Sequence, residues 1–282
     1  METGSFCGFD VDLRPDGITV VTFAVPDRLN ALTRAAKRDL IETLLQAQMD
    51  DRVRVIVFTG AGRAFVAGDE LDRARQEAAR PRLVAPLPYG ELSALRTYES
   101  LRSASQLLTS TIHRFGKFTI AAVNGHAIQS GLSIALASDL RIASSEARLG
   151  SATLRYGFLP DEGGHWLLAR QLGEARAMQF LLRNKIIPAD EALDLGLVDE
   201  VVAPSDLMAT ALARAAELAA APQVAARLLK QAVRNAMDMS LEQALDDVAS
   251  KTAISDHHPD AVEGRTAFHE KRPPAFNQWL ET

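Results

Sequence analysis

Two adjacent carboxylates, Asp161 and Glu162, lie in a segment rich in proline and glycine, directly before an apolar stretch. A carboxylate in such a segment can act as a general base or as a nucleophile. The same pattern also suits structure alone, with Asp161 capping a helix and Glu162 in the first helical turn. The segment by itself leaves these alternatives open.

Two segments of small residues are candidates for holding an oxyanion. Residues 60–71 lead from a strand-like run through three glycines into a charged stretch, and small side chains let a ligand approach the backbone. Residues 124–137 pass from Asn-Gly through a polar turn into an almost wholly apolar helix, whose N-terminus presents free N–H groups. Each pattern also occurs in ordinary turns, so neither is specific alone.

The histidines do not indicate a metal site. His126 lies in the second of these segments, where we expect a structural role, and His165 precedes Trp166 in a loop that both residues are expected to fix by packing. His257 and His258 lie in a polar turn near the C-terminus. Because no His, Cys and carboxylate residues share the spacing of metal ligands, we expect no metal.

The elements that position these segments alternate between strands and helices. Leu32, Ala36, Leu40 and Leu44 are spaced to form one apolar helical face, with Thr33 as its N-cap. Further helices are expected over residues 207–221 and 223–237. β-branched or apolar runs predict strands at residues 18–23, 53–58, 119–123, 140–143 and 198–202. The alternation predicts an α/β chain whose strands are buried on both faces.

Composition excludes several classes of protein. With 282 residues, 47% apolar and 24% charged, the chain is neither disordered nor collagen-like. Its single cysteine, Cys7, excludes a disulfide scaffold. A net charge of −5 provides no basic field for nucleic acid, and no apolar run approaches the roughly 20 residues of a membrane span. We therefore expect a cytoplasmic enzyme or binding protein, with neither nucleic acid nor membrane as a partner.

Taken in order and spacing, these segments resemble the enoyl-CoA hydratase/isomerase (crotonase) superfamily. The resemblance runs from residues 27–32, through residues 63–71 and 124–143, to residues 268–273. It implies an α/β fold with a crotonase-like ββα spiral core, which we place over residues 1–203, and a helical C-terminal trimerisation region over residues 204–282. It also implies an acyl-CoA thioester as substrate, with coenzyme A as part of that substrate and no separate cofactor.

The resemblance implies that the backbone amides of Asp69 and Ser130 hold the thioester oxygen while an enolate develops. Family members usually carry alanine and glycine at these positions, but a backbone donor survives replacement of the side chain. Losing one such donor typically costs about 3–4 kcal/mol of transition-state stabilisation. The substrate-binding residues that the resemblance implies are Arg28, Ala31, Ala67, Gly68, Asp69, Gly131 and Lys271.

Departures from the family pattern point to the reaction. Family hydratases carry two glutamates, which would fall at Ser133 and Thr153 here, and hydroxyls do not replace a carboxylate base near neutral pH. Residues 160–168 resemble the Pro-Asp-x-Gly-Gly-x-Trp-Leu-Leu loop of phenylacetyl-CoA-type isomerases. We therefore predict an enoyl-CoA isomerase or related lyase that uses Asp161 or Glu162, with Asp161 favoured, rather than a standard hydratase.

Two alternatives stay open. In family dehalogenases that act on aromatic acyl-CoA, a nucleophilic aspartate falls at the position of Asp161, which implies a hydrolytic enzyme that works through a covalent ester. The absence of both family glutamates also fits a catalytically silent acyl-CoA-binding homologue.

The C-terminal sequence bears on assembly. Its alanine- and leucine-rich helices have more apolar surface than a small subdomain hides, which together with the resemblance implies a homotrimer, or a hexamer of two trimers. Residues 268–276 resemble the closing motif of the family, so Lys271 is expected to bind a CoA phosphate of a neighbouring subunit or else only to solvate the chain end. Residues 81–90 contain three prolines and predict an irregular loop, either a roof over the acyl pocket or a surface insertion.

Overall fold

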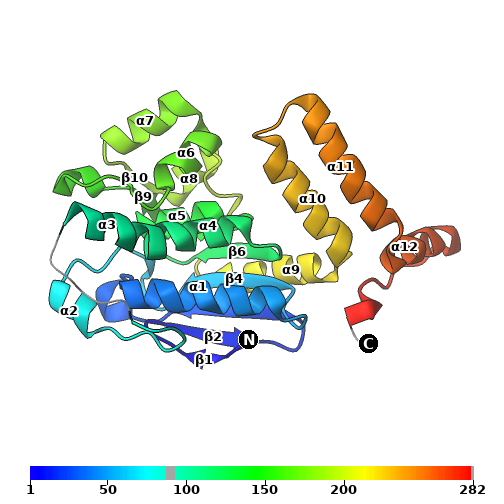
Figure 1. Ribbon diagram of the computed structural model, residues 1–282, viewed down its shortest axis with the longest axis horizontal. Helices are drawn as coiled ribbons and strands as arrows, with labels where there is room; N and C mark the ends of the chain where they lie inside the picture. The colour runs from blue at the N-terminus through cyan, green and yellow to red at the C-terminus, as the bar shows by residue number, and fades with distance from the viewer. Residues whose placement is uncertain (87–92, 281–282) are drawn as a thin grey trace.

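Two β-sheets form the centre of the molecule in the computed structural model, which describes residues 1–86 and 93–280 (Figure 1). The seven-stranded sheet has the order β1-β2-β3-β4-β6-β8-β11, and the four-stranded sheet has the order β10-β9-β7-β5. The strands of the larger sheet are β1 (Gly4–Ser5), β2 (Phe9–Leu13), β3 (Ile18–Phe23), β4 (Val55–Gly60), β6 (Phe118–Val123), β8 (Leu140–Ser144) and β11 (Glu200–Val202). Those of the smaller sheet are β5 (Ala64–Val66), β7 (His126–Ile128), β9 (Arg148–Gly150) and β10 (Ile186–Pro188).

Helices follow the strand pairs in a repeating pattern. The N-terminal half of the chain contains α1 (Arg34–Met49), α2 (Arg73–Ala78), α3 (Ala94–Ser100), the π-helical turn η2 (Leu101–Ser105), α4 (Gln106–Arg114) and α5 (Ser130–Ala137). The C-terminal half contains α6 (Gly164–Leu172), α7 (Glu174–Leu182), α8 (Ala189–Asp194), α9 (Leu207–Ala220), α10 (Gln223–Ala236), α11 (Leu241–Asp256) and α12 (Pro259–Glu270). Short 3-10 turns are η1 (Pro26–Arg28), η3 (Thr153–Tyr156) and η4 (Gln278–Leu280).

The strand pairs show the predicted ββα spiral. β4, β6 and β8 lie side by side and parallel in the larger sheet, and each is followed by a short strand, β5, β7 or β9, of the smaller sheet. Each repeat thus adds one strand to each sheet before the chain enters a helix. The α/β fold with a spiral core is therefore confirmed.

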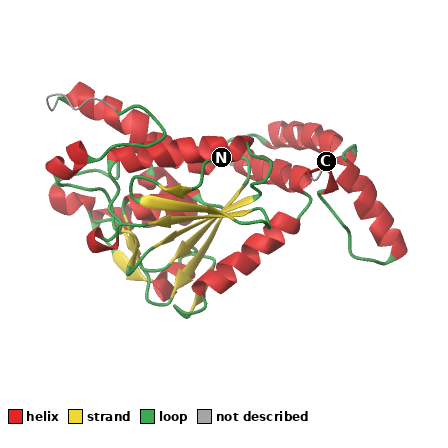
Figure 2. Cartoon of the chain, turned by 90° about the horizontal axis from the view of Figure 1, so that it is seen from below, coloured by secondary structure: helices red, strands yellow, loops and turns green. Residues whose placement is uncertain are grey.

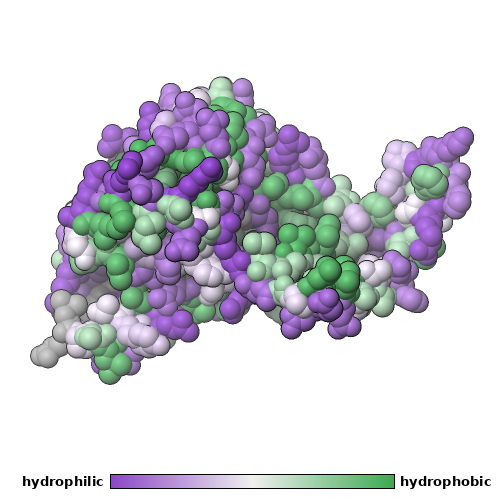
Figure 3. All heavy atoms as spheres, turned by 90° about the horizontal axis from the view of Figure 1, so that it is seen from above, coloured by the Kyte–Doolittle hydropathy of each residue, from purple (hydrophilic) through white to green (hydrophobic). Residues whose placement is uncertain are grey.

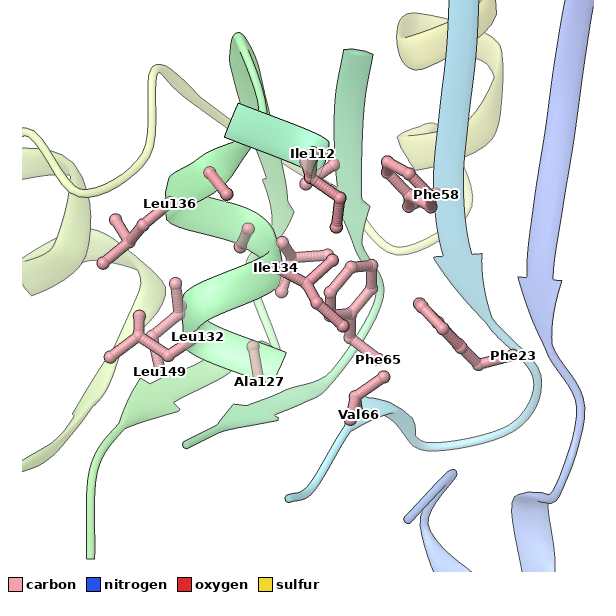
Figure 4. Close-up of a cluster of buried hydrophobic side chains, with 14 of the residues drawn as sticks. Phe23, Phe58, Phe65, Val66, Ile112, Ala127, Leu132, Ile134, Leu136 and Leu149 are labelled. Carbon is pink, nitrogen blue, oxygen red and sulfur yellow. The ribbon is translucent and has the colours of Figure 1, made fainter. Parts of the chain in front are cut away.

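Helices cover both faces of the larger sheet (Figure 2). On one face, α1, α4 and α5 pack over an apolar cluster that includes Phe23, Phe58 and Phe65 (Figure 4). Every residue of α5 is buried, as its almost wholly apolar sequence predicts. On the other face, α9 inserts Leu207, Ala211, Ala215 and Ala219 against the strands.

Most predicted elements lie within two residues of their expected bounds. Thr33 caps α1 as predicted, since its hydroxyl accepts a hydrogen bond from the Ala36 amide at 3.1 Å. The predicted strand at residues 53–58 begins two residues later, because the amides of Val53 and Arg54 bond to Asp50 and Gly17 in the preceding turns. Of the predicted loop at residues 81–90, residues 81–86 are irregular and residues 87–90 lie outside the described residues.

The C-terminal helices divide into two parts. α9 belongs to the core, although the boundary expected at residue 204 groups it with the C-terminal region. α10, α11 and α12 extend away from the sheets (Figure 1). Apolar side chains are exposed along α10 and α11, and Figure 3 shows apolar surface on this side of the molecule. The exposed side chains include Leu229, Val233, Met237, Leu241, Leu245 and Ile254.

Candidate active site

The first expected oxyanion donor, the amide of Asp69, follows β5. Three backbone hydrogen bonds hold this loop: Ala67 donates to Leu29, Leu32 donates to Gly68, and Glu70 donates to Leu32, each at 3.0 Å. Within the described residues, no group accepts a hydrogen bond from the Asp69 N–H. The loop is thus fixed on both sides of an amide that stays free to bind a ligand.

The second expected donor, the amide of Ser130, begins α5 and lies beside Asp69. The Ser130 hydroxyl donates to Oδ1 of Asp69, which brings the two residues together although 61 positions separate them. Gly131 permits this approach, because a Cβ there would lie 2.0 Å from the Val66 carbonyl oxygen. As the first residue of a helix, Ser130 has an N–H without a partner in that helix.

A buried lysine that the sequence analysis did not select completes this part of the site. Lys37 on α1 is 3% exposed, and its Nζ lies 2.5 Å from Oδ2 of Asp69 and 2.7 Å from Oγ of Ser105. Its charge therefore neutralises the Asp69 carboxylate beside the two amides. The sequence held one signal for this burial: Lys37 adjoins Ala36, which lies on the predicted apolar face of α1.

Glu162 is buried, and neutral side chains among the described residues donate hydrogen bonds to its carboxylate. It is 4% exposed, its carboxylate accepts hydrogen bonds from Nε2 of Gln129 at 2.8 Å to each oxygen, and the Ser133 hydroxyl donates to Oε1 at 2.7 Å. Burial raises the pKa of Glu162 above its ordinary value, against the opposing effect of these donors. Gln129 was not predicted from sequence, since a single glutamine carries no distinctive pattern.

Asp161 lies beside Glu162 but is exposed, and its backbone carbonyl accepts a hydrogen bond from Nε2 of Gln106 at 2.9 Å. Burial of part of its surface and the negative charge of Asp69 raise its pKa. The interpretation of Asp161 as a helix cap is wrong, because α6 starts at Gly164 with Gly163 as N-cap, and no side chain caps it. The positive φ of 107° at Gly163 suits glycine and turns the chain so that both carboxylates precede the helix.

Both carboxylates line a cavity of about 520 Å³ between α4 and the start of α6. His113 and Trp166 also line it, and their rings meet edge to face at 5.2 Å. Burial, with the nearby charges of Arg234 and Arg170, lowers the pKa of His113 to about 4, so this imidazole is neutral at pH 7. The lining of the cavity therefore combines two carboxyl groups with two aromatic rings.

The family model for enoyl-CoA hydratase/isomerase matches residues 14–279. The chain belongs to this family. It is 34% identical to the 1,2-epoxyphenylacetyl-CoA isomerase of Escherichia coli over 92% of this chain and 95% of that protein. It is 35% identical to the (E)-benzylidenesuccinyl-CoA hydratase of Thauera aromatica, again over 92% and 95%. A crystal structure of enoyl-CoA hydratase from Bacillus anthracis superposes with a TM-score of 0.85 at 28% identity, covering 95% of this chain and 98% of that one.

The two positions at which the resemblance implies glutamates in family hydratases border the Glu162 network. Ser133 donates directly to Glu162, while Thr153 lies 3.5 Å from the Ser151 hydroxyl, which in turn donates to Gln129 at 2.6 Å. A carboxylate that precedes α6 thus lies beside Ser133, the first of these positions.

Two of the expected substrate-binding residues line a second hollow, next to the oxyanion loop. Arg28 and Ala31 border a space of about 290 Å³ together with Cys7 and Arg75. Arg28 is held by Glu70, whose Oε2 lies 3.0 Å from Nη1. Arg28 and Arg75 thus share Glu70 as an acidic partner at this hollow.

Lys271 is not brought to this site within one chain. It ends α12 in the left-handed conformation, with φ 56°, and α12 lies far from α2 and α3 in Figure 1. The other histidines make local contacts: His165 with the Pro160 carbonyl, His257 with Ala253, and His258 as N-cap of α12.

Within residues 1–86 and 93–280, no three His, Cys, Asp or Glu side chains are grouped as metal ligands would be. No helix in this part of the chain is both long and apolar enough to cross a bilayer.

Proposed function

We propose that this member of the family is an enoyl-CoA isomerase, or a related lyase, which shifts a proton through a thioester enolate. The main support is that two backbone amides and two carboxyl groups come together from three segments distant in sequence. The Asp69–Ser130 contact brings the amides together, and Gln129, the neighbour of Ser130, bonds to Glu162. The coenzyme A thioester of the substrate would place its carbonyl oxygen on the two amides.

In the proposed reaction, a carboxylate takes a proton from the carbon alpha or gamma to the thioester carbonyl. The electron pair moves onto the carbonyl oxygen, where the Asp69 and Ser130 amides stabilise the enolate. The carboxyl then returns the proton to the other carbon, which shifts the double bond. We assign this transfer to Asp161, because its side chain is open to the cavity and its raised pKa suits a group that must both take and give a proton.

The shape of the cavity supports a ring-containing or medium-length acyl group. Along the helix from Gln106, beside Asp161, to His113, seven residues correspond to about 10 Å. The Trp166 and His113 rings then offer an aromatic end wall for a ring.

Incubation with 3-enoyl-CoA thioesters in deuterated water tests the proposal. The expected result is migration of the double bond with deuterium incorporated at the alpha or gamma carbon. Neither exchange nor migration across linear, alicyclic and aromatic acyl groups would refute it.

The exposed position of Asp161 also suits nucleophilic attack, the second candidate. A single turnover in oxygen-18 water distinguishes the two, because a nucleophilic aspartate first acquires the label in its own carboxyl. Tight acyl-CoA binding without turnover, unchanged by Asp161→Asn and Glu162→Gln, would instead indicate a silent binding protein.

We also propose a homotrimer, alone or paired into a hexamer, in which Lys271 reaches the coenzyme A of a neighbouring subunit. The exposed apolar side chains of α10 and α11 support this assembly, since large exposed apolar patches mark interaction sites. Lys271→Ala is expected to weaken acyl-CoA binding without dissociating the oligomer, measured by calorimetry and light scattering. A monomer at micromolar concentration would contradict the assembly, and unchanged affinity would contradict the role of Lys271.

A further inference from the structure

Gln129 has a backbone conformation that residues with side chains rarely adopt. Its φ of 52° and ψ of −104° match the first central position of a type II′ turn, which glycine dominates. Two backbone hydrogen bonds of 2.9 Å hold it there, one from its N–H to Gly150 and one from the Ser133 N–H to its carbonyl. Strained residues persist where the surroundings determine them, and they cluster at functional sites.

The side chain of Gln129 provides contacts that glycine would lack. The Ser151 hydroxyl donates to Oε1 at 2.6 Å, which directs the NH₂ group of Gln129 towards both oxygens of Glu162 at 2.8 Å. The Ser133 hydroxyl adds a third hydrogen bond to Glu162. All three contacts present donors to the carboxylate, an arrangement that suits its ionised form.

The charged groups that act most directly on Glu162 oppose that ionised form or are already paired. Asp161 adjoins it, the negative charge of Asp69 acts on it, and Lys37 is paired with Asp69. The other charged or titratable groups that line the same cavity are Arg102, His113, Arg114 and His165. Because burial also disfavours the charge, the neutral donors Gln129 and Ser133 are the contacts that favour the carboxylate.

We propose that Gln129 is a positioning residue, whose strained backbone lets its amide hold the Glu162 carboxylate beside the oxyanion amide of Ser130. Ser130 follows Gln129 directly, so a single residue sets the spacing between the group that binds the enolate oxygen and a carboxylate of the cavity. The inference rests on the proposed function, in which this cavity carries out proton transfer.

Gln129→Gly tests the inference, because glycine relieves the backbone and removes only the side chain. The titration of Glu162 is followed by ¹³C NMR of labelled glutamate, with the signal identified by its loss in Glu162→Gln. Removing the two contacts is expected to raise the pKa of Glu162 by about one unit, a tenfold change in its ionisation constant. The melting temperature should not fall, and kcat should fall about tenfold with KM within threefold.

Ser151→Ala is the matched control, since it leaves the Gln129 backbone and both amide contacts possible but frees the orientation of the amide. A smaller shift of the Glu162 titration in the same direction is expected. Combined with Glu162→Gln, Gln129→Gly should cause no further loss of kcat, because Gln129 acts through Glu162.

A folded Gln129→Gly protein with the wild-type titration of Glu162 would overturn the inference. Equal losses of kcat with and without Glu162 would also overturn it. If Gln129→Gly does not fold, an unchanged Glu162 titration in Ser151→Ala overturns it instead. Failure of the proposed function looks different: the wild type then shows no proton exchange with any thioester, while the NMR titration still measures the effect of Gln129.

Discussion

Two sheltered carboxylates of this protein have opposite surroundings. Asp139, between α5 and β8, accepts hydrogen bonds from the amide and hydroxyl of Thr119 at 2.8 and 3.0 Å. It also pairs with Lys230 and Arg234 of α10, each at 2.7 Å. Glu162 is more deeply buried, but its three contacts come from an amide and a hydroxyl, and no cation pairs with it among the described residues.

The difference separates a carboxylate that pairs with cations from one that is held by neutral donors. Lys230 and Arg234 pair with Asp139, and in doing so they attach α10 to the core. Neutral donors offset the effect of burial on Glu162 only in part, so its pKa stays above the ordinary value. His113 links the two regions, because it lines the cavity of Glu162 and its pKa is lowered partly by Arg234.

The largest expected effect concerns the reaction. Asp161→Asn should lower kcat about 10²- to 10⁴-fold, the usual contribution of a general acid or base, with little change in the melting temperature. Glu162→Gln should also lower kcat, because the new amide would face the donors of Gln129 and Ser133. Steady-state kinetics and thermal melts check both. Full activity in the two variants would show that the cavity carboxyls take no part in the reaction.

Asp139→Asn should affect the stability of the fold rather than the chemical step. Removing this carboxylate leaves Lys230 and Arg234 without their shared partner, and breaking a buried ion pair costs about 3–5 kcal/mol. Denaturant unfolding measures the loss, with Asp161→Asn as the control that keeps stability. A variant as stable as the wild type would show that these cations do not attach α10.

A smaller effect on kcat is expected from replacing Lys37. This lysine is the cationic partner of Asp69, whereas Glu162 has no such partner among the described residues. Lys37→Met would leave the negative charge of Asp69 beside the oxyanion amides and so disfavour the enolate. We expect kcat to fall about tenfold, or ~1.4 kcal/mol of activation free energy. Ser105→Ala removes only the other contact of Lys37 and should cost less. Equal rates for Lys37→Met and the wild type would contradict this role.

The smallest expected effect is the pH dependence of stability at His113. Its folded pKa of about 4 lies below the ordinary 6.5, so between these values the unfolded chain binds more protons and acidification favours unfolding. From pH 7.5 to pH 5.5, the melting temperature of the wild type should therefore fall about 2 °C further than that of His113→Gln. Parallel curves for the two proteins would show that His113 is not buried uncharged.

The sequence by itself determined the elements and the order of the segments that carry the site. The β-branched run at residues 18–23 and the alanine-rich helix at residues 207–221 were predictable because each carries a long, regular apolar pattern. The smaller sheet was not predictable, since its strands have only three residues each and show no period.

Only the tertiary structure decided the chemical environment of the candidate groups. It placed Lys37 beneath Asp69, set Gln129 against Glu162, and left Asp161 open to the cavity instead of capping α6. Each of these contacts joins groups whose spacing in the chain carries no signal, because the spiral brings the ends of successive repeats together. Burial and the identity of the nearest donor set the charge of a carboxylate, and both arise only when the chain has folded.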